Sequence, residues 1–77
     1  MVEIYLGGYL NYFDREKRSH FTLAISQKMR LIEILVQLEV PLEEIAFTSV
    51  NSELVNLEIA QVSPGDRIEF FPPMGGG

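Results

Sequence analysis

Hydrophobic and polar residues alternate in several short stretches of the chain, as they do in strands that bury one face. Strands are therefore expected at residues 2–6, 20–25, 45–50, 53–55 and 67–71. In the last of these stretches, Ile68 and Phe70 are expected to face the core. Glu69 and Phe71 then lie on the opposite face, because successive side chains of a strand point to opposite sides of the sheet.

One stretch has a helical pattern instead. From residue 27 to about residue 39, apolar positions recur at spacings of four and three, which predicts an amphipathic helix with Ser26 as its N-cap. Pro41 ends it, because the residue before a proline is displaced from helical geometry. Residues 57–62 have no clear period, and we expect a single helical turn there. Pro64-Gly65 fits the two central positions of a type II turn.

This order of elements predicts an α+β fold. One helix covering one face of a small sheet is an α+β arrangement, and a helix of this length also serves as the crossover that parallel strands require. The pattern is that of a β-grasp, or ubiquitin-like, domain: a small mixed sheet covered by one main helix, followed by an extended flexible C-terminal glycine tail. We expect the domain to span residues 1–72 and the tail residues 73–77.

Several polar and aromatic stretches are interpreted as ordinary surface or packing. The run of charges at residues 14–18 and the pair at residues 43–44 are expected to be solvated. His20 has no second histidine or acidic cluster near it in sequence, so we expect an exposed residue without a catalytic role. The aromatic residues of the opening segment are expected to pack under the first loop; they are Tyr5, Tyr9, Tyr12 and Phe13.

Composition excludes several kinds of chemistry. The 77 residues contain no cysteine and one histidine, so no thiolate nucleophile is present, and a zinc or iron–sulfur site is not expected. The net charge of −5 argues against nucleic acid as a partner and favours a protein with a basic groove. No apolar run is long enough to span a membrane, and no signal-peptide pattern is present. A chain without cysteine suits the reducing cytoplasm, so a cytoplasmic location is expected. No motif here places a nucleophile beside a base.

The most informative stretch is the C-terminal one, Phe-Phe-Pro-Pro-Met-Gly-Gly-Gly, at residues 70–77. The sheet should end at or near Pro72, because proline donates no backbone hydrogen bond. Two prolines also stiffen the exit of the chain. The glycines that follow have no side chains and can adopt almost any backbone angle, so such a tail can enter a narrow active site.

These residues resemble the small sulfur-carrier subunit of molybdopterin synthase and, more distantly, the thiamine-biosynthesis sulfur carrier. The molybdopterin type ends in Phe-Phe-Pro-Pro, two variable residues and Gly-Gly, a pattern that residues 70–77 match at the same length. Residues 50–55 and 63–68 are similar to two further family segments, with Ser52 where glycine is usual. Residues 7–13 depart from the family's usual opening. Thiamine-type carriers generally lack Pro-Pro, so Pro72-Pro73 favours the molybdopterin type.

The resemblance implies a carrier, not an enzyme, with no bound cofactor. A ubiquitin-activating-type adenylyltransferase would use ATP-Mg to convert the Gly77 carboxylate to an acyl-adenylate, and a persulfide sulfur donor would then yield a thiocarboxylate. The large subunit of molybdopterin synthase would accept the sulfur. The residues that the resemblance assigns to the partner's active site are Met74, Gly75 and Gly76, and those assigned to the partner interface are Phe71, Pro72 and Pro73.

Three alternatives remain open from the residues alone. A ubiquitin-like modifier would use Gly77 identically but transfer it to a lysine of a target protein. A thiamine or tRNA-thiolation carrier would differ only in the sulfur acceptor. A β-grasp binding module would use no terminal chemistry and would tolerate extra residues after Gly77. Asp66 and Glu69, near the tail, either pair with a partner's basic groove or serve solubility.

Overall fold

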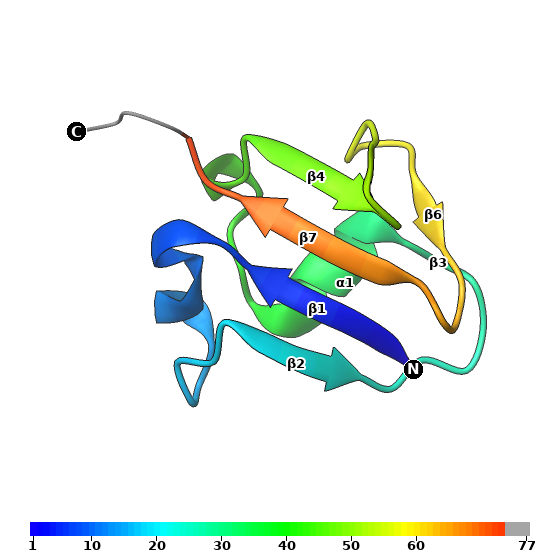
Figure 1. Ribbon diagram of the computed structural model, residues 1–77, viewed down its shortest axis with the longest axis horizontal. Coiled ribbons are helices and arrows are strands. Elements are labelled where there is room, and N and C mark those ends of the chain that lie inside the picture. Colours follow the sequence, from blue (N-terminus) through cyan, green and yellow to red (C-terminus); the bar gives the residue numbers. More distant parts are fainter. Residues whose placement is uncertain (74–77) are drawn as a thin grey trace.

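The computed structural model describes residues 1–73, which form one layer of sheet and one main helix (Figure 1). The strands are β1 (Val2–Leu6), β2 (His20–Leu23), β3 (Met29–Arg30), β4 (Phe47–Val50), β5 (Glu53–Leu54), β6 (Gln61–Val62) and β7 (Arg67–Phe71). The helices are α1 (Leu31–Leu38) and two short 3₁₀-helices, η1 (Gly8–Phe13) and η2 (Leu42–Glu44).

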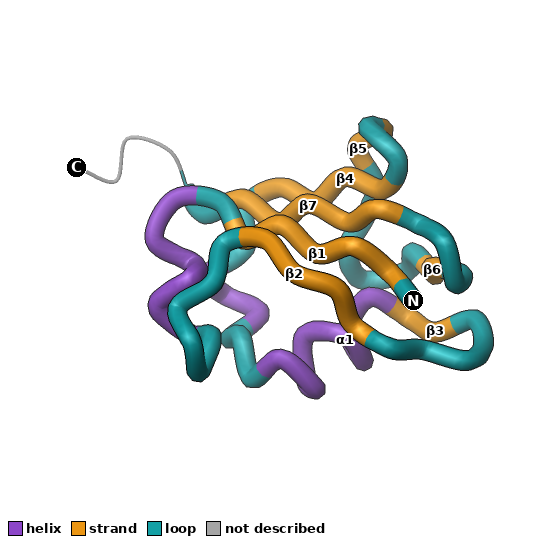
Figure 2. The backbone as a smooth tube through the Cα atoms, turned by 60° about the horizontal axis from the view of Figure 1, so that its bottom comes forward, coloured by secondary structure: helices purple, strands orange, loops and turns teal. Residues whose placement is uncertain are grey.

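The main sheet is mixed, with strand order β2-β1-β7-β4-β5. The central strands β1 and β7 are parallel, and the other neighbouring pairs are antiparallel. Helix α1 lies under one face of this sheet, and no helix of residues 1–73 covers the other face, which we call the open face (Figure 2). The predicted α+β, β-grasp arrangement is therefore confirmed.

The core lies between the sheet and α1. In β1 and β7 every second residue is buried, so the alternation seen in the sequence is also the alternation of the structure. Ile68 and Phe70 are fully buried, as predicted, and Phe71 is only half-buried on the opposite face. The buried apolar residues are Val2, Ile4, Leu6, Leu10, Ile25, Leu31, Ile34, Leu35, Val40, Val62, Ile68 and Phe70.

Helix α1 is shorter than the sequence pattern predicts. It begins at Leu31, and Met29–Arg30 pair with Gln61–Val62 in a second, two-stranded sheet. Ser26 is therefore not the N-cap. Arg30 occupies that position with extended backbone, and the Glu33 carboxylate accepts its backbone N–H at 3.0 Å. Residues 57–62 likewise end in strand β6, so the expected helical turn accounts for only part of that segment.

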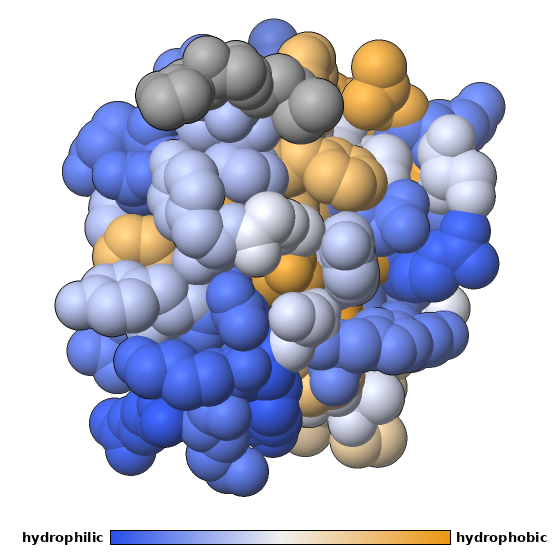
Figure 3. All heavy atoms as spheres, turned by 60° about the vertical axis from the view of Figure 1, so that its left-hand side comes forward, coloured by the Kyte–Doolittle hydropathy of each residue, from blue (hydrophilic) through white to orange (hydrophobic). Residues whose placement is uncertain are grey.

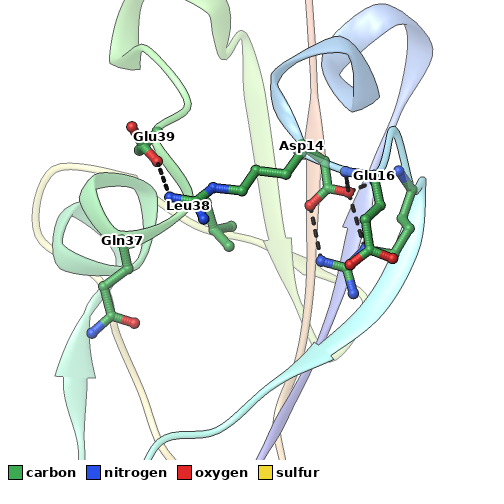
Figure 4. A pocket seen from close by; sticks show the side chains of 7 residues that line it. Asp14, Glu16, Gln37, Leu38 and Glu39 are labelled. Atoms are coloured by element: carbon green, nitrogen blue, oxygen red, sulfur yellow. Dashed lines mark hydrogen bonds and ion pairs between the residues drawn. The ribbon is translucent and has the colours of Figure 1, made fainter.

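The charged segment at residues 14–18 is not simply solvated. Asp14 is 8% exposed, and its carboxylate accepts the backbone N–H groups of Glu16 and Arg18, both at 2.9 Å. The Arg18 guanidinium adds two more hydrogen bonds at 3.0 Å each. Figure 4 shows this cluster at a small pocket that also reaches the end of α1, where Arg15 lies 3.7 Å from Glu39. The buried Asp14 carboxylate therefore holds the loop of residues 14–18 together through hydrogen bonds.

The aromatic opening is also more exposed than expected. Tyr9 and Tyr12 keep 51% and 68% of their surface accessible, so the prediction that they pack under the first loop is wrong. Phe13 does pack against the core, and Tyr5 is half-buried on the open face of the sheet. Both exposed rings belong to η1, whose one fully buried side chain is Leu10.

Candidate functional site at the base of the tail

The candidate site begins where the chain leaves the sheet. Residues 74–77, which include Gly77 and the three residues expected to enter a partner, lie outside the described residues. The described part of the site is Phe71, Pro72 and Pro73, directly after the central strand β7 (Figure 1). The sheet ends at Phe71, which confirms the prediction that the two prolines terminate it.

The backbone at this exit is held from both sides. The carbonyl oxygen of Phe70 accepts the Gly7 N–H at 2.8 Å, and the carbonyl oxygen of Phe71 accepts the Ala46 N–H at 2.8 Å. Gly7 follows β1 and Ala46 precedes β4, so one hydrogen bond comes from each neighbouring strand. The position of the chain is therefore fixed up to Pro72 by groups far away in sequence.

The two prolines differ in their surroundings. Pro72 is buried, and its ring lies against Gly8: a Cβ at Gly8 would be 2.7 Å from Pro72 Cγ. Gly8 also has a φ of +51°, a conformation that side chains disfavour. Pro73 is exposed. Pro72 thus packs within the chain's own fold, and the assignment of these residues to a partner interface stays a prediction.

Phe71 lies on the open face of the sheet, away from α1. Its ring centroid is 5.9 Å from that of Tyr5, with the ring planes tilted by 58°. On its other side it is paired in register with Phe47, which is 49% exposed. We call Tyr5, Phe71 and Phe47 the aromatic strip. The strip crosses three adjacent strands at the end of the sheet from which the chain emerges.

Most of the rest of the open face is polar, and exposed Leu54 lies at its far edge, on β5. Glu69 accepts the Ser49 hydroxyl at 2.8 Å, and His20 Nε2 lies 3.4 Å from Glu3 Oε1. His20 is exposed, as predicted. A shallow hollow on this face is lined by Glu3, Tyr5, His20, Arg67 and Glu69.

Asp66 is tied into a turn. It accepts the Ser63 backbone N–H at 2.8 Å and the Asn51 side-chain amide at 3.0 Å. These two hydrogen bonds, the backbone one foremost, hold the pKa of Asp66 below its usual value. The sequence leaves open whether Asp66 and Glu69 face a partner or serve solubility. In the structure, both carboxylates accept hydrogen bonds from groups of the chain itself.

The end of the molecule at which the chain leaves the sheet carries both apolar and hydrophilic surface. Figure 3 shows apolar surface in its upper part and strongly hydrophilic surface below. Within residues 1–73, no group of histidine and carboxylate side chains is arranged to hold a metal ion. In the same range, no helix is long and apolar enough to cross a membrane.

Sequence reasoning missed the residues that support the exit. Gly8, Ala46 and Phe47 were not candidates, because each acts through a contact with β7 or with Pro72 that is remote in sequence. A glycine doublet such as Gly7-Gly8 indicates a turn or a bulge, but it does not show which side chain packs on it.

Three solved structures share this fold. A subunit complex of molybdopterin-converting factor from Helicobacter pylori contains a chain 22% identical, with a TM-score of 0.62 over 99% of this chain and 97% of that one. The thiamine biosynthesis protein ThiS of Geobacter metallireducens is 24% identical in its crystal structure, with a TM-score of 0.59 over 97% and 99% of the two chains. An NMR structure of a thiamine biosynthesis protein from the same organism gives 24% identity and a TM-score of 0.54 over 97% and 87%.

At these identities the likeness establishes the fold. No curated protein sequence matches the chain significantly. The sequence model of the ThiS family, however, matches residues 9–77, which include the whole of the described exit and the tail. The match begins inside η1 and runs through every strand that forms the site except β1. The chain therefore belongs to the ThiS family.

Proposed function

We propose that the protein is a sulfur carrier that is activated at Gly77 and donates sulfur for molybdopterin in the cytoplasm. The observation that carries the proposal is the pattern at residues 70–77, within a ThiS-family match that extends to Gly77. The structure adds a rigid base to that pattern, since β7 is held on both sides up to Pro72. A rigid base and a chain of small residues suit the delivery of a terminal group to another protein's active site.

The chemistry follows from the nature of a carboxylate. A terminal carboxyl has a pKa of about 3.5 and is an anion near neutral pH, which makes it a poor electrophile. In the proposed cycle, an adenylyltransferase transfers AMP from ATP-Mg to the carboxylate with release of pyrophosphate. Hydrosulfide then displaces AMP and leaves the thiocarboxylate directly. Alternatively, a persulfide displaces AMP to give an acyl disulfide, and a thiol cleaves this disulfide, which releases the thiocarboxylate and leaves a new disulfide on the donor. The carrier supplies the acyl group and its position, and the partners supply the catalysis.

The aromatic strip is the proposed docking surface for these partners. It is apolar, partly exposed and adjacent to the exit of the chain. Aromatic side chains near the centre of an interface commonly dominate its affinity. The net charge of −5 favours partners that surround this contact with basic residues. One structural neighbour is itself part of a complex of two molybdopterin-converting factor subunits, which supports a large-subunit partner for this fold.

The two prolines support the proposed sulfur acceptor. Pro72-Pro73 is the feature that favours the molybdopterin type over the thiamine type. The second candidate is a thiamine-pathway carrier, which the family model and the name of the Geobacter protein support. Both candidates share activation and thiocarboxylate formation, so one experiment tests the common step and another the acceptor.

The common step is tested by intact mass spectrometry. The protein is incubated with a ubiquitin-activating-type enzyme of the same organism, ATP-Mg and a sulfur donor, and the mass gain from replacing one oxygen by sulfur is measured. Oxidation of one of the three methionines gives nearly the same gain, so fragmentation must place the sulfur on Gly77. A Gly77 deletion and a variant with one alanine added after Gly77 are the controls. Absence of both adenylate and thiocarboxylate, with an enzyme shown to be active, would contradict the proposal.

The acceptor is tested with the thiocarboxylated protein. It is offered separately to the large subunit of molybdopterin synthase with its pterin precursor and to the thiazole-forming enzyme of thiamine biosynthesis. Sulfur transfer to the pterin alone supports the molybdopterin assignment, and transfer to the thiazole alone moves the protein to the thiamine pathway. Lysine-linked conjugates of Gly77 in cell extracts, without either transfer, would indicate a protein modifier.

A further inference from the structure

The further inference concerns Tyr9 and Glu44, which neither the sequence pattern nor the proposed chemistry uses. The Tyr9 hydroxyl donates to Glu44 Oε1 at 2.7 Å, across 35 positions of sequence. Tyr9 belongs to η1 and Glu44 to η2, and these 3₁₀-helices adjoin the two strands that flank β7. Among residues 1–73, no other hydrogen bond joins η1 to η2.

This bond connects the two supports of the chain exit. The residue before Tyr9 is Gly8, on which the buried ring of Pro72 lies. Two residues after Glu44 is Ala46, whose N–H holds the carbonyl of Phe71. A link between Tyr9 and Glu44 therefore joins the segment under Pro72 to the segment that fixes the preceding peptide.

The Tyr9–Glu44 hydrogen bond is expected to be favourable although it is exposed to solvent. The acceptor is a carboxylate, and hydrogen bonds to charged groups are stronger than those between neutral groups. A tyrosine hydroxyl is protonated at neutral pH and can donate, and the hydrogen bond to Glu44 raises the pKa of the Tyr9 phenol further above its ordinary value. Tyr9 stays 51% exposed, which leaves its ring without the packing that would otherwise fix it.

We propose that the Tyr9–Glu44 pair is a clasp that keeps Pro72 seated on Gly8 and thereby sets the direction in which the tail leaves the domain. Tyr9 and Glu44 are positioning residues in this scheme, and they act on the tail through Gly8 and Ala46. The inference rests on the proposed use of the tail by an activating enzyme. In this scheme the enzyme receives a tail whose base is already oriented. Less conformational entropy is therefore lost when the tail enters the active site.

The first test is structural and does not depend on function. In NMR spectra, the nuclear Overhauser effect between the Gly8 α-protons and the Pro72 ring is measured in wild type, Tyr9→Phe and Tyr12→Phe. Tyr12 is the matched control, because it lies in the same 3₁₀-helix and is 68% exposed but makes no bond to η2. We expect the effect to weaken in Tyr9→Phe and to be unchanged in Tyr12→Phe. Equal intensities in all three proteins overturn the clasp.

The second test separates presentation of the tail from docking of the body. Steady-state adenylation is measured with the activating enzyme. Loss of an exposed hydrogen bond of this kind should lower kcat by about three- to tenfold in Tyr9→Phe and Glu44→Ala, with KM changed by less than about twofold. Glu44→Gln keeps an acceptor oxygen and should retain most of kcat. The double variant Tyr9→Phe/Glu44→Ala should be no slower than either single variant, because both remove one interaction.

Each outcome decides a different point. A raised KM with unchanged kcat means that Tyr9 and Glu44 contact the enzyme directly, which overturns the positioning role. Kinetic losses in Tyr12→Phe equal to those in Tyr9→Phe also overturn it. If wild type forms no adenylate, the proposed function fails, and the nuclear Overhauser measurement alone decides whether the clasp seats Pro72.

Discussion

The Asp14 carboxylate gives a prediction whose size follows from the structure. It accepts four hydrogen bonds, two from backbone N–H groups and two from the Arg18 guanidinium, while 8% exposed. The hydrogen bonds from Arg18 are the largest cause that lowers the pKa of Asp14 from 3.8 to about 2. Asp14→Asn keeps the shape of the side chain, removes its charge and replaces one acceptor oxygen by an NH2 donor, so the pH-dependent part of its effect reports the charge contribution.

The magnitude follows from linkage between protonation and folding. A carboxyl whose pKa is lower in the folded than in the unfolded protein stabilises the fold above its unfolded pKa, and the contribution is lost as pH falls through the folded pKa. A shift from 3.8 to about 2 corresponds to at most about 2.5 kcal/mol. Arg18 is 44% exposed, so solvent screening reduces this to roughly 1–2 kcal/mol. For a domain of this size, the loss of this stabilisation lowers the melting temperature by about 4–16 °C.

The assay is urea denaturation of wild type and Asp14→Asn between pH 7 and pH 2, with Glu16→Gln as the control. Glu16 is an exposed carboxylate in the same loop. The pH-dependent part of the difference between wild type and Asp14→Asn should be full above about pH 5, near half at about pH 3 and small at pH 2. A difference that is constant down to pH 2, or equal to that of Glu16→Gln, would refute the reasoning.

Three further predictions concern single side chains. Thr48 is 2% exposed and its hydroxyl has no hydrogen-bond partner among residues 1–73, so Thr48→Val should leave the free energy of unfolding unchanged or raise it by about 0.5–2 kcal/mol; a loss above about 1 kcal/mol contradicts this. Gly65 has a φ of +100° with open space at its Cβ position, so Gly65→Ala should cost about 1–2 kcal/mol in urea denaturation from backbone strain alone, and an unchanged midpoint would argue against that strain. Phe71→Ala should weaken binding to the proposed large subunit at least about tenfold by calorimetry, whereas Leu54→Ala, exposed at the far edge of the same face, should not; equal effects would remove the aromatic strip from the interface.

The alternation of residues along the chain predicted most strands because burial follows it directly. Ile68 and Phe70 face the core and Phe71 does not, as a period of two requires. Pro72 ended the sheet, since its nitrogen has no hydrogen to donate. Gly65 has the positive φ that the second central position of a type II turn requires. These features depend on residues next to one another in the chain.

The errors share a different cause. The helix was expected from residue 27, but Met29 and Arg30 form strand β3 by pairing with β6, whose sequence lies beyond the helix. Residues 57–62 were expected to form a helical turn, but Gln61–Val62 form strand β6 by pairing with β3. Local propensity is a weak preference, and a pairing partner elsewhere in the chain overrides it.

The sequence by itself determined the β-grasp class, the place where the sheet ends and the glycine-rich tail as the candidate site. Only the tertiary structure decided how the base of that tail is held. Pro72 rests on Gly8, and the carbonyls before it bond to Gly7 and Ala46. These groups become neighbours because β7, the last strand, inserts between β1 and β4. No local pattern encodes such contacts, since their partners are brought together only when the sheet has formed.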